Sequence, residues 1–449
     1  MRIEGAHGPL GKAKSDAIVA GLKAQSPQGS VLDHHLAIEE ALTDNALTAG
    51  NRVTLLEDGK ATYASMLAAL RGAKSSIGME AYIFEDDEIG AEFASALEER
   101  AKAGVKVRLI YDSVGSNKTP KEFFKAMSAA GVQVVEFNPL SPETVVKSGL
   151  AALNHRDHRK LTVIDGRVAF LGGINISGVY MSGSAGSGPS AGGSNGASSQ
   201  ARAGKDYDPK DPPFDKRPWR DTQVRIEGPA VADLERAFLR QWAAQKKENL
   251  LDDKGYFPKL AAVGTQYVRV IESSPASSGT GLNPLYLTVI SAIDHAETEV
   301  RITMAYFVPH PELMRALKEA AGRGVDVKLI LPSRTDSWIV FQAGRSYYGD
   351  LLEAGVKIYE RKTRLLHAKT ATIDGVWSTV GSTNLDWRSL VDNDELNAVV
   401  LGPDLAMQMN AVFDKDLANS SAITRDEWAR RSIVDRVKEA AAKAWSRLL

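Results

Sequence analysis

The feature that most constrains the fold of this chain is an eight-residue motif that occurs twice. Residues 158–165 read His-Arg-Lys-Leu-Thr-Val-Ile-Asp, and residues 367–374 read His-Ala-Lys-Thr-Ala-Thr-Ile-Asp. Both copies follow the pattern His-x-Lys-x4-Asp, and both are followed by glycine. A pattern repeated at an offset of 209 residues (367 minus 158) indicates two related folding units.

The repeat extends beyond the motif on both sides. The matching segments are 172–175 with 381–384, 104–110 with 324–330, 130–132 with 354–356, and, more loosely, 79–82 with 303–306. The pattern of each half predicts helix, strand, helix, strand, helix, strand and then a hairpin. We therefore expect the α/β class, with two similar lobes, each a mixed sheet flanked by helices, rather than a solenoid of short repeats.

Each motif is predicted to form a β-hairpin. A short apolar run ends in Asp-Gly and is followed by a second apolar run, a pattern typical of a tight turn between two strands. Side chains alternate across a strand, so His158 and Lys160 share one face, as do His367 and Lys369.

Downstream of the motif the offset changes. Residues 220–229 match residues 394–403 at an offset of 174 (402 minus 228), a register that pairs Asp221 with Glu395. The first half therefore carries 35 extra residues (209 minus 174) after Asn175. Much of this insertion is rich in Ser and Gly, and we expect a flexible surface loop at about 181–217.

Composition narrows the functional classes. Lys and Arg number 55 and Asp and Glu 56, so the chain has no global basic field, which makes a nuclease less favoured. The absence of cysteine rules out disulfides and thiolate metal sites. No apolar run reaches the roughly 20 residues that span a bilayer, so we expect a soluble or peripheral protein.

Two histidines and two lysines meet the needs of two-step phosphodiester cleavage without metal or cofactor. One neutral imidazole attacks phosphorus, while the other, protonated, supplies a proton to the leaving group. Lys160, Lys369, Asn175 and Asn384 are predicted to hold the non-bridging oxygens. As an alternative, each asparagine caps the turn that follows it.

A nucleophilic imidazole needs an acceptor that fixes its other nitrogen. Asp221 and Glu395, equivalent by the repeat, are predicted to be these acceptors, with a surface salt bridge as the alternative. Asp165 and Asp374 belong to the motifs but lie at the hairpin turns, so a structural role is assigned to them. No role is assigned to His155 or His310, which lack equivalents in the repeat.

These residues resemble the phospholipase D superfamily, whose HKD motif has the same pattern. The resemblance covers nearly the whole chain from about Asn51 and implies two lobes related by a pseudo-twofold axis, with one shared active site. It also implies that His158 is the nucleophile and His367 the general acid and base. The motif residues carried over to the catalytic centre are His158, Lys160, Asp165, His367, Lys369 and Asp374.

Within the superfamily, the chain is most similar to the bacterial branch of cardiolipin synthases and phospholipase D-like proteins. The segments that carry this similarity are 51–59, 79–84, 154–158, 381–389 and 393–397. Such enzymes transfer a phosphatidyl group from one phospholipid to another, typically phosphatidylglycerol. Many have two N-terminal transmembrane helices, and no such helices are expected within this sequence.

The predicted organisation has five parts. They are an N-terminal extension (1–50), a first lobe (51–247), a linker (248–268), a second lobe (269–420) and a C-terminal helix (421–449).

Two segments are candidates for membrane contact. Residues 141–153, present only in the first lobe, have apolar residues at helical spacing and are predicted to form a flap, or else to cover the core. The run 426–449 is predicted to be an interfacial helix, or else to pack on the second lobe. Its apolar face has Val437, Ala441, Trp445 and Leu448, beside basic residues Arg430, Arg431, Arg436, Lys438, Lys443 and Arg447.

The leading hypothesis is a phosphatidyltransferase of the cardiolipin synthase type, peripheral to the bacterial inner membrane on the cytoplasmic side, with the periplasmic side left open. Its expected partners are phospholipids such as phosphatidylglycerol, and no nucleic acid is expected. The alternatives are a hydrolytic phospholipase D, a nuclease or other phosphodiesterase, and an inactive lipid-binding module. The sequence makes no prediction of oligomeric state.

Overall fold

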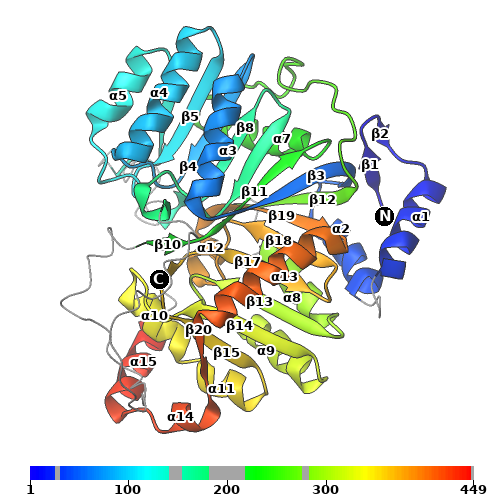
Figure 1. Ribbon diagram of the computed structural model, residues 1–449, viewed down its shortest axis with the longest axis vertical. Coiled ribbons are helices and arrows are strands. Elements are labelled where there is room, and N and C mark those ends of the chain that lie inside the picture. The colour runs from blue at the N-terminus through cyan, green and yellow to red at the C-terminus, as the bar shows by residue number, and fades with distance from the viewer. Residues whose placement is uncertain (26–30, 141–153, 182–217, 276–282, 446–449) are drawn as a thin grey trace, which may run out of the picture.

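One continuous mixed sheet runs through both halves of the molecule (Figure 1). The computed structural model describes residues 1–25, 31–140, 154–181, 218–275 and 283–445. The predicted flap at 141–153 and, apart from Met181, the predicted loop at 181–217 lie outside these residues.

The first lobe has the predicted alternation of helices and strands. Its sheet follows the order β6–β5–β4–β8–β9–β11–β3, in which β4, β5 and β6 are parallel and the other neighbours are antiparallel. The elements are β3 (Leu47–Glu57), α3 (Asp58–Gly72), β4 (Ser76–Ala81), α4 (Glu88–Lys102), β5 (Lys106–Asp112), α5 (Lys121–Ala129), β6 (Gln133–Phe137), β7 (Arg156–Asp157), β8 (Leu161–Ile164), β9 (Val168–Gly172), a 3-10 turn (Gly178–Tyr180), β10 (Trp219–Arg220), β11 (Thr222–Glu227) and α7 (Val231–Lys246).

The second lobe repeats this arrangement. Its sheet follows the order β15–β14–β13–β17–β18–β19–β12, with β20 added at the outer edge. The elements are β12 (Gln266–Ser273), α8 (Pro284–Asp294), β13 (Glu299–Met304), α9 (Pro311–Gly322), β14 (Asp326–Pro332), α10 (Trp338–Arg345), α11 (Tyr348–Glu353), β15 (Lys357–Arg361), β16 (Leu365–Leu366), β17 (Lys369–Ile373), β18 (Trp377–Gly381), α12 (Trp387–Val391), β19 (Asn393–Leu401), α13 (Pro403–Ala418) and β20 (Ser420–Ile423).

The two half-sheets meet where β3 pairs antiparallel with β12. On either side of this junction the strand order is the same, read outward: β11, β9, β8, β4, β5, β6 in one direction and β19, β18, β17, β13, β14, β15 in the other. The predicted α/β class and the two similar lobes are therefore confirmed. A twofold relation between the lobes follows from this mirrored order.

Repeated glycines explain why equivalent helices end where they do. Gly104 and Gly324 lie just past the ends of α4 and α9, at φ values of 88° and 93°, and each precedes a strand of the sheet. A left-handed residue is costly for any side chain with a Cβ and is readily adopted by glycine, which commonly closes helices in this way. The matched segments 104–110 and 324–330 thus each begin at the end of a helix.

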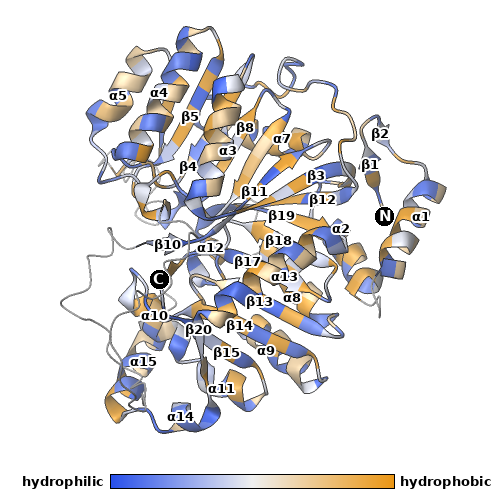
Figure 2. Ribbon diagram, in the orientation of Figure 1, coloured by the Kyte–Doolittle hydropathy of each residue, from blue (hydrophilic) through white to orange (hydrophobic). Residues whose placement is uncertain are grey.

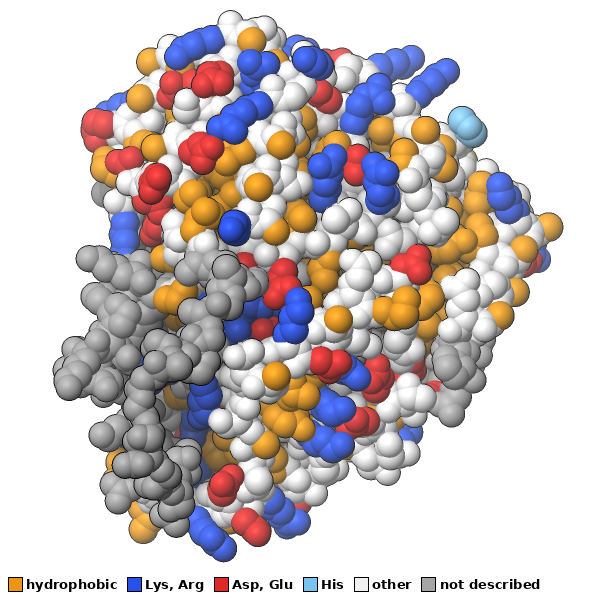
Figure 3. Space-filling model, in the orientation of Figure 1, with side chains coloured by type: hydrophobic (Ala, Val, Ile, Leu, Met, Phe, Trp, Pro, Cys, Tyr) orange, Lys and Arg blue, Asp and Glu red, His pale blue; other side chains and the backbone are white. Residues whose placement is uncertain are grey.

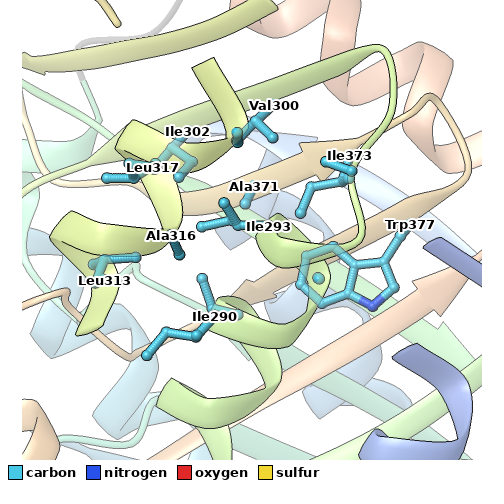
Figure 4. Packing of buried hydrophobic residues seen from close by; sticks show 14 of the residues in the cluster. Ile290, Ile293, Val300, Ile302, Leu313, Ala316, Leu317, Ala371, Ile373 and Trp377 are labelled. Atoms are coloured by element: carbon cyan, nitrogen blue, oxygen red, sulfur yellow. The ribbon is translucent and has the colours of Figure 1, made fainter. Parts of the chain in front are cut away.

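Helices cover both faces of the sheet. In the first lobe α3, α4 and α5 pack on one face and α7 on the other, and α13 takes the place of α7 in the second lobe. The helices show hydrophobic residues on part of their circumference and hydrophilic residues on the rest (Figure 2). In the second lobe, side chains from α8, α9, β13 and β17 pack together in one cluster, with Trp377 at one side of it (Figure 4). Each fully buried Ile or Leu there stabilises the folded state by about 1.5–3 kcal/mol relative to an exposed side chain.

The predicted N-terminal extension packs against the second lobe. It comprises β1 (Ile3–Gly5), β2 (Gly8–Pro9), α1 (Lys12–Gln25), a π-helical turn (Val31–His35) and α2 (Leu36–Leu42). Ile3, Leu22 and Leu36 belong to the hydrophobic core of that lobe. The predicted boundary at 51 falls inside β3, which begins at Leu47. Within the predicted linker, 248–265 has no helix or strand, and β12 begins at Gln266.

The C-terminal part differs from the single helix predicted for 421–449. Residues Ser420–Ile423 form β20, which extends the sheet beside β15. Two helices follow, α14 (Arg425–Ala429) and α15 (Ile433–Trp445). The side chain of Trp428 is buried against Tyr348 and holds α14 on the second lobe, so the chain turns before α15 begins. Residues 446–449 lie outside the described part.

Candidate active site

Both Asp-Gly sequences form the predicted hairpin turns. Asp165 and Gly166, at φ values of 54° and 59°, connect β8 to β9, and Asp374 and Gly375, at 51° and 63°, connect β17 to β18. Two successive residues with positive φ are the signature of the type I′ turn that suits a twisted hairpin. Each motif thus supplies the first strand of its hairpin and the first residue of the turn.

The two motif aspartates anchor the hairpins rather than point toward the histidines. The carboxylate of Asp165 accepts hydrogen bonds from the backbone amides of residues 74–76 and from the Ser75 hydroxyl. Asp374 accepts the equivalent bonds from the amides of residues 297–299 and from the Thr298 hydroxyl. Each turn is thus tied to the start of the neighbouring strand, β4 or β13.

Short strand pairs between the lobes position the two histidines. β7, which leads into His158, pairs in parallel with the start of β19, and the amide of His158 donates to the carbonyl of Asp394 at 3.0 Å. β16, which leads toward His367, pairs in parallel with β10, and the amide of His367 donates to the carbonyl of Arg220 at 2.8 Å. Each histidine is therefore held in register with a strand of the other lobe.

The same register brings each imidazole to a carboxylate of the opposite lobe. Nδ1 of His158 lies 3.0 Å from Oε1 of Glu395, and Nδ1 of His367 lies 2.7 Å from Oδ2 of Asp221. Because a carboxylate accepts, Nδ1 carries the hydrogen and Nε2 is left with its lone pair. The sequence named both carboxylates but did not indicate that the pairs cross between the lobes.

The two carboxylates have different surroundings. Glu395 accepts from the hydroxyls of Ser382 and Ser389, at 2.5 and 2.7 Å. The residue equivalent to Ser382 in the first lobe is Gly173, where an added Cβ would lie 2.2 Å from Oδ1 of Asp221. The repeat Gly-Gly-Ile-Asn against Gly-Ser-Thr-Asn is therefore explained: glycine leaves room for one carboxylate, and serine donates to the other.

The two lysines are buried beside the histidines. Nζ of Lys160 donates to the carbonyl of His158, and Nζ of Lys369 to that of His367, both at 2.5 Å. Burial lowers the pKa of Lys160 to about 7, with the charge of Lys369 as the next cause, and burial lowers the pKa of Lys369 to about 8. The ammonium of the second motif thus acts on the lysine of the first, and both lysines are close enough to Asp221 and Glu395 to feel their charges.

Burial and the neighbouring lysines favour the neutral form of both imidazoles. Burial lowers the pKa of His158 well below its ordinary value, and Lys160, Lys369 and His367 add to the effect. Burial and Lys369 likewise lower the pKa of His367, although Asp221 opposes them. Burial also raises the pKa of Glu395, to about 7. The site thus disfavours added positive charge until an anion enters.

Aromatic residues that the sequence reasoning missed line the site. The ring of Tyr82 lies edge-on to His158, with centroids 4.9 Å apart, and Nζ of Lys160 lies 4.8 Å from the Tyr82 ring centroid. Tyr306 stands in the equivalent place, edge-on to His367 at 6.3 Å. The signal was present, because Tyr82 and Tyr306 occupy matching positions of the repeat. Trp219, 4.9 Å from His367, has no such signal.

The two predicted asparagines are buried but differ in their partners. Oδ1 of Asn175 accepts from the amide of Ile83, and its Nδ2 donates to the hydroxyl of Tyr180. Oδ1 of Asn384 has no hydrogen-bond partner among the described residues. The structure thus gives Asn175 a framework role, and phosphate contact by either side chain stays a prediction.

His155 and His310 each contact a residue outside the two motifs. Nε2 of His155 lies 3.0 Å from Oδ2 of Asp394, across the lobe interface, and the ring of His310 stacks on Trp387. In the part of the chain that the structure describes, no three His, Asp or Glu side chains cluster as a metal site.

Comparison with known proteins identifies the family. The model of the family described as "Cardiolipin synthase, PLD-like domain" matches residues 66–184 and 289–417, one segment in each lobe. The chain belongs to this phospholipase D-like family. It is an enzyme of the phospholipase D superfamily, as the paired motifs predicted.

Curated relatives agree with this assignment. A protein named cardiolipin synthase from Halalkalibacterium halodurans is 35% identical over 91% of this chain and 74% of its own length. One of the same name from Geobacillus kaustophilus is 33% identical over 92% of this chain and 76% of its own length.

A solved structure shows the same fold at low identity. The phosphatidylserine synthase of Haemophilus influenzae aligns over 92% of this chain and 97% of its own, with a TM-score of 0.61 and 13% identity. Among the described helices of this phospholipase D-like enzyme, none has the length and apolar character needed to traverse a bilayer.

Proposed function

We propose that this enzyme is a phosphatidyltransferase of the cardiolipin synthase type, which works through a covalent phosphohistidine without a metal ion. The observation that carries the proposal is the crossed arrangement, in which two neutral imidazoles, each oriented by a carboxylate, lie with two buried lysines at one site. The relatives named cardiolipin synthase indicate the substrate class.

In the first step, Nε2 of His158 attacks the phosphorus of one phosphatidylglycerol molecule. The bond from phosphorus to the glycerol oxygen breaks, and His367 gives a proton to that oxygen, so glycerol leaves. In the second step, a hydroxyl of another phosphatidylglycerol attacks the phosphohistidine and loses its proton to His367. The N–P bond breaks, cardiolipin forms, and both imidazoles return to their starting state.

Substrate binding supplies the charge that the acid step needs. Burial is the largest cause that lowers the pKa of His367, to about 4, and Lys369 and Lys160 add to it, so this imidazole is unprotonated near neutral pH before substrate binds. A phosphodiester anion between Lys160 and Lys369 offsets both ammonium charges and favours protonation of the adjacent imidazole. The proton donor is thus prepared only when the substrate is bound.

Product analysis with purified enzyme and phosphatidylglycerol tests this function. Cardiolipin plus glycerol is the expected result, and EDTA should leave the rate unchanged. Changing His158 to Ala should abolish formation of both products, because no phosphohistidine can form. Full transfer by that variant, or a strict requirement for a divalent cation, would overturn the mechanism.

Hydrolysis is the second candidate, because water and a lipid hydroxyl compete for the same phosphohistidine. Phosphatidic acid as the sole product would assign the enzyme as a phospholipase D. A nuclease is less favoured, because Lys and Arg are interspersed with Asp and Glu on the face that Figure 3 shows and nearly balance them in number over the chain. Absence of DNA binding at low salt would exclude it.

We also propose peripheral contact with an anionic bilayer through α15, most simply at the cytoplasmic face of the inner membrane. Ile433, Val434 and Val437 lie on one side of this helix and are 78%, 62% and 62% exposed. Basic residues of the same region, Arg430 and Arg436, are also exposed. An apolar helix face beside basic residues suits the boundary between headgroups and acyl chains.

A further inference from the structure

A second pair of cations lies beside His158, apart from the two lysines. Arg156 belongs to β7, two residues before His158, and Arg388 belongs to α12 of the opposite lobe. Neither arginine is part of a motif, and the mechanism above uses neither. Their placement raises the question of which anion they serve.

Arg156 is a buried guanidinium with spare hydrogen-bond donors. Its side chain is 1% exposed, and its Nη1 donates to the hydroxyl of Ser113 at 2.9 Å and lies 3.7 Å from Asp112. Among the described residues, its Nε and Nη2 have no hydrogen-bond partner. Burying such donors unpaired costs free energy, so an acceptor that arrives with a ligand would be strongly favoured.

Arg388 approaches the same place from the second lobe. The next residue, Ser389, donates through its hydroxyl to Oε1 of Glu395, the oxygen that lies 3.0 Å from Nδ1 of His158. Arg388 is exposed and makes no ion pair with any described residue. Burial is the largest cause that lowers the pKa of Arg156, and the positive charge of Arg388 adds to it. The same charge contributes to the lowered pKa of His158 and opposes the rise in the pKa of Tyr82.

The two positions equivalent to this pair on the His367 side are not cationic. At the offset of 209 that relates the motifs, Arg156 corresponds to Leu365 and Arg388 corresponds to Val179. Both positions that are cationic beside His158 are therefore apolar beside His367. The two half-sites share their reacting groups and differ in charge around them, as expected if two different molecules occupy them.

We propose that Arg156 and Arg388 bind the phosphodiester of the second, acceptor phospholipid while its glycerol hydroxyl attacks the phosphohistidine at His158. The donor phosphate occupies the lysines, so the second anion needs its own cations. The attacking hydroxyl is separated from its phosphate by a three-carbon glycerol, a span that suits neighbouring sites. Two guanidinium groups match the oxygens of a phosphate. This inference rests on the proposed transfer reaction.

The proposed pocket also explains how transfer competes with hydrolysis. Water carries no phosphate and gains nothing from the arginines, whereas the acceptor lipid is held with its hydroxyl near phosphorus. Binding energy from a part of the substrate that does not react is thereby used to favour one reaction over another.

The test uses Arg388→Val, which installs the residue found at the mirror position and changes an exposed side chain. With phosphatidylglycerol vesicles, cardiolipin formation should fall by about tenfold or more, with a higher KM for the acceptor, while release of phosphatidic acid persists. Arg388→Lys should recover part of the transfer. Arg71→Val, which removes an exposed arginine on α3, is the matched control and should change neither product.

Exchange of labelled glycerol into phosphatidylglycerol separates the acceptor site from the reacting groups. Glycerol is an acceptor without phosphate, so Arg388→Val should exchange it at nearly the wild-type rate. Equal losses of glycerol exchange and cardiolipin formation would overturn the proposal, and so would an unchanged ratio of cardiolipin to phosphatidic acid.

Two further results would distinguish a wrong acceptor site from a wrong transfer function. One outcome is that inorganic phosphate protects the wild-type enzyme against unfolding while Arg388→Val leaves the ratio of cardiolipin to phosphatidic acid unchanged. That outcome would assign the pocket to free phosphate and overturn the proposal. A wild-type enzyme that forms no cardiolipin under any condition would instead remove the proposed transfer function itself.

Discussion

At the level of single residues, the structure assigns different surroundings to side chains that the repeat makes equivalent. The motif histidines and lysines could be predicted because rare residue types recur at a fixed offset. The partner of each histidine in space could not, because it depends on how the lobes dock. Ser382 and Gly173 illustrate this. Ser382 donates a hydrogen bond to Glu395, and Gly173 leaves room for Asp221, and neither contact can be seen in the sequence.

The proposed roles of the two histidines predict different responses to an activated substrate. His367→Ala should be nearly inactive toward phosphatidylglycerol but should form phosphohistidine from a p-nitrophenyl phosphodiester, whose leaving group needs no proton. His158→Ala should form none from either substrate. Trapping of labelled phosphoenzyme after acid-free quenching measures this. Label retained in His158→Ala would reverse the assignment.

The lysines predict the alkaline side of the pH profile. An ammonium is charged below its pKa, so attraction for the phosphodiester is present at lower pH and is lost as the pH rises through about 7 for Lys160 and about 8 for Lys369. The value of kcat/KM should therefore fall above pH 7 to 8. The pKa of His158 is lowered, so this nucleophile stays neutral across that range. A flat profile to pH 9 would contradict the prediction.

At the level of elements, hairpins and helices were predictable and the shortest strands were not. The Asp-Gly turns and the glycines that close α4 and α9 follow from local backbone preferences. The strands β7, β10 and β16 are two residues long, and each exists only because a strand of the opposite lobe lies beside it. No local pattern can encode such a pairing. The division of the C-terminal run into α14 and α15 likewise depends on packing of Trp428.

The anchored hairpin predicts a loss of stability on mutation of its aspartate. Asp374→Ala leaves three backbone amides near α8 and β13 without their acceptor and should lower the free energy of unfolding by about 2–3 kcal/mol. Urea unfolding of this variant, with the exposed Asp252→Ala as control, measures the change. Lost activity at unchanged stability would point to a chemical role for Asp374 instead.

The equivalent turn predicts a dependence of stability on pH. Burial opposes ionisation of Asp165, but hydrogen bonds from Ser76, Ser75 and Lys74 bring its pKa below the ordinary value of 3.8. A lowered pKa means that Asp165 stabilises the fold above that value and that its contribution is lost as the pH falls further. Asp165→Asn should therefore flatten the acid side of the stability profile, which urea unfolding between pH 3 and 6 would detect.

At the level of the whole molecule, the sequence repeat predicted two lobes, and the strand order shows how they join. β3 and β12 make one sheet of two half-sheets, and the core between α7 and α13 draws residues from both. The N-terminal extension, which carries no repeat signal, is built into the core of the second lobe. The position of this extension depends on buried apolar contacts, which no sequence motif predicts.

The proposed contact with a membrane involves the whole molecule, which would bind through α15. Replacing Ile433, Val434 and Val437 together by Ser should weaken binding to vesicles that contain phosphatidylglycerol, while activity toward a monomeric short-chain substrate is kept. Met407→Ser is the control, because this side chain is equally exposed but lies on α13. Vesicle flotation measures the binding. Undiminished flotation of the triple variant would move the contact away from α15.

The crossed histidine pairs have a consequence for the life of the chain before it is complete. His158 receives its carboxylate from residue 395, so the first half emerges from the ribosome before the partner of this imidazole has been made. The pair between His158 and Glu395 is complete only when the late strand β19 has been synthesised and docked beside β7. A truncated chain that ends before residue 395 therefore lacks one of the two histidine–carboxylate pairs.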